Sequence, residues 1–199
     1  MTTQTPTTVT PTTVTPISLS AAAFAVYAAL SLAWALPSAA ATPAADTASD
    51  TPVESAALRC SAISQLHSTL TVPSPQFGQL MGDIAGLFAQ IHTTQKHARI
   101  KGKLSTNELK GRREAVLTEI IKGWPANKAA IVREAATCNA WRIAFFGKLP
   151  EKPSDKEFQS AMLNLEAPPA DVPKPDIDKW AALTTQAMGA WTAIKAPAK

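Results

Sequence analysis

The first 45 residues of the chain contain no lysine, arginine, aspartate or glutamate. Every charged side chain therefore lies from Asp46 onward, and that part carries the whole formal charge of +4. A net charge this small does not by itself indicate a nucleic-acid-binding protein. The hydrophobic content of 46% is high enough to form a packed core, which argues against a wholly disordered chain.

The sequence motifs of several common enzyme classes are also missing. The chain has no glycine-rich phosphate loop, no H-E-x-x-H, no G-x-S-x-G and no C-x-x-C. Nucleotide-binding, zinc-protease, serine-hydrolase and dithiol-redox functions are therefore without support. No acids are spaced as a catalytic pair. We expect no cofactor, and we favour a binding protein over an enzyme.

Residues 1–41 have the composition of a targeting segment. They begin with low-complexity Thr-Pro repeats and continue into an uncharged apolar run at 17–36. As a helix this run would reach about 30 Å, enough to cross a bilayer. Pro37 ends the run, and the small residues at 38–41 resemble a signal-peptidase site. We expect a cleaved signal peptide. The alternative is a retained anchor that contacts the membrane, although no basic residue precedes the run, as either would normally require.

Both interpretations place residues 46–199 outside the cytoplasm, in the periplasm or the extracellular space. The only cysteines are Cys60 and Cys138. An even number of cysteines in an exported chain favours a disulfide, although free thiols and pairing across chains remain open. His67 follows Cys60 on one helix face, but two such ligands do not make a metal site, and we predict none.

The remaining sequence predicts an all-α fold: a four-helix bundle plus a C-terminal helix, pinned by one disulfide. No segment alternates with a period of two, so we expect no sheet. We divide this part into a flexible tether at 42–53, a bundle at 54–147, a proline-rich acidic strap at 148–175 and a C-terminal helix at 176–199 that packs on the bundle.

Apolar periodicity predicts the helices within these parts. We expect them from 52 or 54 to 70, 76 to 101, 106 to 123 and 125 to 146, with a short amphipathic piece at 154–165 and a last helix at 175–195. Ser105 and Glu108 form a predicted capping box, and Gly102 is a predicted C-cap. The helix at 125–146 has two apolar faces, one ending at Ile143, which predicts a central position.

Three glycines, Gly78, Gly82 and Gly86, recur every four residues and so share one helix face. Each costs about 1 kcal/mol relative to alanine within a helix. We expect the close approach of a neighbouring helix to offset this cost. The same spacing occurs at membrane helix dimer faces, so one alternative is a membrane-anchored structural protein that assembles through this face.

Basic residues are concentrated where the second and third predicted helices join. The stretch 96–113 holds seven lysines and arginines, with Glu108 as its only acid. Such a concentration attracts anionic lipid, acidic polysaccharide or acidic protein. No aromatic residue is interleaved, so we expect no nucleic acid partner. We call the following residues the basic cluster: Lys96, His97, Arg99, Lys101, Lys103, Lys110, Arg112 and Arg113.

The sequence thus predicts an exported, non-enzymatic helical binding protein of the cell envelope, whose basic cluster contacts an anionic partner. The alternative is that the cluster is a solvated hairpin end that keeps the protein soluble and binds no partner. Seven acids at 151–178 suggest two further options, a strap that masks the cluster or an ordinary polar surface. An envelope enzyme with a dispersed site, for instance His67 with acids of neighbouring helices, is another alternative.

Overall fold

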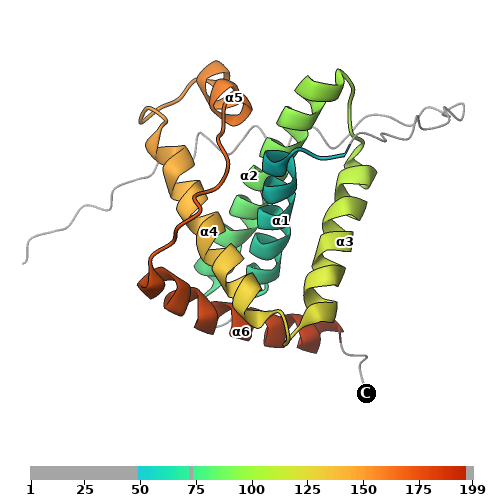
Figure 1. The fold of residues 1–199 in the computed structure, drawn as a ribbon, viewed down its shortest axis with the longest axis vertical. Helices are drawn as coiled ribbons and strands as arrows, with labels where there is room; N and C mark the ends of the chain where they lie inside the picture. The colour runs from blue at the N-terminus through green and yellow to red at the C-terminus, as the bar shows by residue number, and fades with distance from the viewer. Residues whose placement is uncertain (1–48, 72–73, 196–199) are drawn as a thin grey trace, which may run out of the picture. The chain divides into compact units, whose positions relative to one another are not determined.

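The computed structural model describes residues 49–71 and 74–195, and this part of the chain is all-helical, as predicted (Figure 1). Residues 1–41, the predicted targeting segment, and most of the predicted tether lie outside the described residues. In order, the helices of the described part are α1 (Pro52–His67), α2 (Pro75–Ile100), α3 (Thr106–Gly123), α4 (Lys128–Gly147), α5 (Asp155–Leu163) and α6 (Lys174–Lys195).

Helix α1 is the central element, because it contacts α2, α3, α4 and α6. In Figure 1 it lies between α3 and α4, and α6 crosses the end of the bundle below it. The core combines fully buried residues of α1, such as Ile63 and Leu66, with a stacked pair, Phe88 of α2 and Trp141 of α4, whose ring centroids are 5.3 Å apart. The prediction that α4 is central was wrong, because α1 holds that position and one apolar face of α4 opens to solvent at its end, with Ile143 56% exposed.

The predicted disulfide is present and joins the middle of α1 to the middle of α4. Cys60 and Cys138 are bonded, with their Cα atoms 5.4 Å apart. Arg59, next to Cys60, reinforces the same level of the bundle by pairing with Glu119 of α3 and Glu134 of α4. A structural disulfide of this kind indicates that the folded part resides in a non-reducing, exported compartment.

Local sequence accounts for most helix boundaries. The predicted capping box of α3 is confirmed, since the Glu108 amide donates to Ser105 and the Ser105 amide donates to Glu108. The predicted C-cap at Gly102 was displaced by one residue, because Lys101 takes the left-handed conformation with φ of 51°. Helix α4 begins at Lys128 rather than near Pro125, because residues 124–127 form turns.

The glycine face of α2 is not packed along its length. A Cβ on Gly78 would lie 2.8 Å from Thr71 Cγ2 and 3.0 Å from the Ser68 carbonyl oxygen, so this glycine permits a close approach of the α1–α2 connection. A Cβ on Gly82 would meet nothing closer than 4.0 Å, and one on Gly86 would meet nothing within 4 Å. A close approach therefore exists at Gly78, but to the α1–α2 connection rather than to a neighbouring helix, and none exists at Gly86.

Candidate functional site

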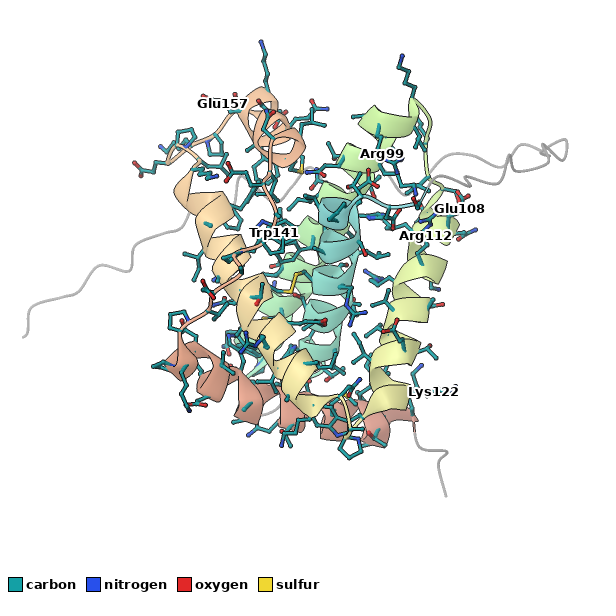
Figure 2. All side chains as sticks on the ribbon, viewed as in Figure 1. Arg99, Glu108, Arg112, Lys122, Trp141 and Glu157 are labelled. Atoms are coloured by element: carbon teal, nitrogen blue, oxygen red, sulfur yellow. A yellow bond between two sulfur atoms is a disulfide. The ribbon has the colours of Figure 1, made fainter. Side chains whose placement is uncertain are left out.

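The basic cluster lies where α2 ends and α3 begins, and we call this part of the bundle the hairpin end. Figure 2 shows Arg99, Glu108 and Arg112 together there, far from Lys122 at the other end of α3. The hairpin forms because Lys101 ends α2 in a left-handed turn and Ser105 starts α3 four residues later. His97 tightens this turn, because its Nε2 accepts a hydrogen bond from the Leu104 amide at 2.7 Å.

Two acids from the start of α1 meet three of the clustered cations. Lys96 is fully buried, and its Nζ lies 2.6 Å from Oδ1 of Asp50. Arg112 of α3 donates to the same oxygen at 3.2 Å. Asp50 thus joins α2 to α3 through a single carboxylate, and the ammonium of Lys96 is not available to an external anion.

Glu54 pairs with Arg99 through two hydrogen bonds, both of 2.8 Å. Its side chain is only 1% exposed and also accepts from the Thr51 amide. Burial by itself would raise the pKa of Glu54, but the hydrogen bonds from Arg99 and Thr51 outweigh it and hold that pKa below its ordinary value. Glu54 therefore stays ionised and fixes the first turn of α1 against α2.

Sequence reasoning missed this pairing, because Asp50 and Glu54 lie more than 40 residues before their partners. A local signal did exist. Thr51 and Glu54 form a capping box, which marks a helix start at Pro52 rather than an extended tether up to residue 53. The described residues 49–53 thus belong to the folded unit.

The ion pairs divide the basic cluster into an inward and an outward set. Lys96, Arg99 and Arg112 hold the start of α1, and His97 holds the turn. The remaining members are at the surface: Lys101, Lys103 and Lys110 are exposed and Arg113 is half-buried. Lys110 lies at 3.9 Å from Glu114, an exposed pair of little energetic weight. Any external anion would therefore meet this outward set.

The described strap has two ion pairs that lie outside the basic cluster. Its ion pairs are Lys148 with Glu166 and Lys174 with Asp178, and neither lysine belongs to the basic cluster. The strap is instead fixed along α4 and α2, where the Trp141 indole donates to the Glu166 carbonyl and the Gln95 amide donates to the Met162 carbonyl. These contacts do not support the masking hypothesis, which stays a prediction.

A groove of about 390 Å³ lies between the C-terminal end of α4 and α5. Its walls are mainly apolar, with Lys148 and Glu157 among its polar residues. Beyond these walls, the last turn of α4 carries Phe146, which is 46% exposed, and α5 ends at Leu163, which is 42% exposed. The lining residues of the groove are Phe145, Lys148, Leu149, Pro150, Glu157, Ser160, Ala161, Asn164 and Leu165.

The histidines do not form a reactive centre. His67 is fully buried, its Nδ1 donates to the Ile63 carbonyl, and its Nε2 accepts from the Thr184 hydroxyl. Burial lowers the pKa of His67 to about 4, so the ring is neutral. His92 is also fully buried and donates to the Glu54 carbonyl. Among the described residues, no group of three or more His, Cys, Asp or Glu side chains is placed to hold a metal ion.

The interior offers little room for a substrate near these groups. A cavity of about 10 Å³ between α1, α2, α4 and α6 would admit one water molecule. His67, around which the enzyme alternative is built, is itself closed to solvent.

No family model matches the chain, and neither a curated protein nor a solved structure matches it. Within the described residues, no helix is long and apolar enough to span a membrane. The apolar run at 17–36 lies outside that part.

Proposed function

We propose that this chain is an exported, non-enzymatic binding protein of the cell envelope, which contacts an anionic partner through the outward basic residues of its hairpin end. The observation that carries the proposal is the division of the cluster. Internal acids neutralise its inward members, whereas Lys101 and Lys103 stand exposed on a turn that the His97 hydrogen bond holds in place.

This arrangement suits recognition of an anion. The ion pairs of Asp50 and Glu54 fix α1, α2 and α3 to one another, so the outward side chains project from an ordered support. An ordered support reduces the entropy lost on binding, which raises affinity for a given set of contacts. Export is supported by the disulfide and by the signal-like composition of residues 1–41.

The test is retention of the full chain on an acidic polysaccharide resin across a salt gradient. We expect Lys101→Glu with Lys103→Glu to elute at clearly lower salt, because exposed charges act through a screened Coulomb attraction. Lys122→Glu with Lys179→Glu is the matched control, since it changes the net charge equally but away from the hairpin end. Equal elution of the two double variants, or binding of the parent chain to neither this resin nor anionic lipid vesicles at physiological salt, would overturn the proposal.

A further inference from the structure

We infer that the anionic partner is a lipid surface, onto which the hairpin end docks with Lys101 and Lys103 at the headgroups and Phe146 and Leu163 at the apolar boundary. This inference rests on the proposed function and names its partner. It depends on three features that the fold brings to one end of the bundle: outward basic residues, exposed apolar residues and the point where the N-terminal segment joins.

The first feature is the point of chain entry. Ser49 and Asp50 lie at the hairpin end, because the Ser49 carbonyl accepts from Arg99 and the Asp50 carboxylate pairs with Lys96. The uncharged apolar run at 17–36 precedes Ser49 by only 12 residues, which reach at most about 40 Å when extended. If this run is retained as a membrane anchor, the alternative to a cleaved signal peptide, the short tether joins it to the hairpin end rather than to the α6 end.

The second feature is exposed apolar surface at the same end. The end of α4 and all of α5 lie at the same end of the bundle as the end of α2, in the upper part of the view, where Glu157 and Arg99 are both labelled (Figures 1 and 2). The last turn of α4, which carries Phe146, and the end of α5, which carries Leu163, therefore lie at the same end of the bundle as the basic turn, and both side chains are half-exposed. Peripheral membrane binding combines buried apolar area with attraction to anionic headgroups.

The third feature is the difference in net charge between the region around α5 and the basic turn between α2 and α3. Around α5, the lysines at 148, 152 and 156 stand among a similar number of acids, at 151, 155, 157 and 166. This side is therefore nearly neutral and contributes its apolar residues. The basic turn on the other side contributes the attraction. A hydrated polysaccharide would leave Phe146 and Leu163 in water, whereas a lipid interface removes them from it, and this difference favours lipid.

The experiment uses the full chain with vesicles of phosphatidylcholine alone or mixed with phosphatidylglycerol. Amide hydrogen exchange is followed at residues 101–105 and 146–150, and affinity is measured by co-sedimentation. We expect slowed exchange at both segments only with the anionic vesicles. Amide exchange at residues 101–105 and 146–150 reports contact of the folded part itself, even where the N-terminal segment inserts into the vesicle. Every variant carries the same N-terminal segment, so differences between variants come from the folded part.

The variants separate the two contributions. Lys101→Gln with Lys103→Gln should weaken binding of the folded part about thirtyfold, at the usual contribution of a basic residue near an anionic surface. Phe146→Ser with Leu163→Ser should weaken it about tenfold, given that each side chain is already half-buried. Lys122→Gln with Lys179→Gln is the control and should leave both exchange and affinity unchanged. An intact disulfide and unchanged helical circular dichroism certify the fold of each variant.

Each remaining outcome decides the matter. Retention on acidic polysaccharide without slowed exchange on anionic vesicles would overturn the lipid inference and leave the proposed function standing. No retention on acidic polysaccharide together with no slowed exchange on anionic vesicles would overturn both the lipid inference and the proposed function. Slowed exchange on neutral and anionic vesicles alike, insensitive to all substitutions, would also overturn the inference, because attachment would then come from the N-terminal segment alone.

Discussion

The two ends of α1 are held by opposite kinds of chemistry. At its N-terminal end, Glu54 and the preceding Asp50 form ion pairs with cations of α2 and α3. At its C-terminal end, His67 is neutral, hydrogen-bonded to Thr184 and covered edge-on by the Trp180 ring of α6, with ring centroids 5.0 Å apart. One helix thus uses charge where the chain enters the fold and avoids charge where a helix closes over it.

This difference fixes how each end responds to acid. The pKa of Glu54 is lowered, so its ion pair contributes stability above the ordinary carboxyl range, and that stability is lost as pH falls through the folded-state value. His67 has its pKa lowered from 6.5 to about 4. Between pH 6.5 and 4, His67 is therefore protonated in the unfolded chain but neutral in the folded one. The free energy of unfolding falls as the pH drops through this range. Both ends weaken in acid, but in different pH windows.

The largest expected effect comes from removing the disulfide, which lies midway between the two ends of α1 and joins α1 to α4. Replacing Cys60 and Cys138 together by alanine should lower the free energy of unfolding by about 4–5 kcal/mol, because the disulfide closes a loop of 78 residues. Both ends should loosen equally, since the bond lies midway along α1. Urea unfolding followed by circular dichroism measures the loss. A loss below about 1 kcal/mol would mean that the bond is not structural.

The next effect breaks the charged end alone. Glu54→Ala should lower the free energy of unfolding by about 3 kcal/mol, because it leaves the Arg99 guanidinium without its two carboxylate bonds and also removes a capping box. Amide exchange should rise first at the start of α1 and the end of α2. Glu157→Ala is the control, since Glu157 forms a capping box at an exposed site on α5. Equal losses in the two variants would show that capping, rather than the buried ion pair, matters.

The third prediction concerns the neutral end and its pH window. His67→Leu should flatten the decline of stability between pH 6.5 and 4, a change that approaches about 1.4 kcal/mol per pH unit for one proton. The decline should persist in Glu54→Ala, because that substitution leaves His67 in place. Unfolding free energies measured across this range provide the test. An unchanged slope in His67→Leu would show that His67 is protonated in the folded protein.

Sequence alone predicted the elements better than their contacts. The bounds of α3 and α6 and the pairing of Cys60 with Cys138 followed from periodicity, capping and export. The inward turn of Lys96 did not, because local sequence cannot show that a distant Asp50 will meet it. The predicted burial of the α4 face that includes Ile143 was wrong for a related reason. Periodicity identifies an apolar face but does not show whether another helix covers it. The anionic partner itself stays a prediction.

The smallest expected effects come from two glycines of α2. Gly78 packs against the residues that follow the neutral end of α1, and Gly86 faces open space. Gly86→Ala should stabilise the fold by about 1 kcal/mol, because the added methyl group meets open space and alanine favours the helix. Gly78→Ala should destabilise it by about 1 kcal/mol, because the methyl group would press on the Ser68 and Leu70 carbonyl oxygens beyond the end of α1. Opposite signs in thermal unfolding would show that these glycines serve different purposes. If Gly86→Ala instead abolished a concentration-dependent increase in mass, the glycine face would be an assembly surface, and the open space beside it would be where a second copy packs.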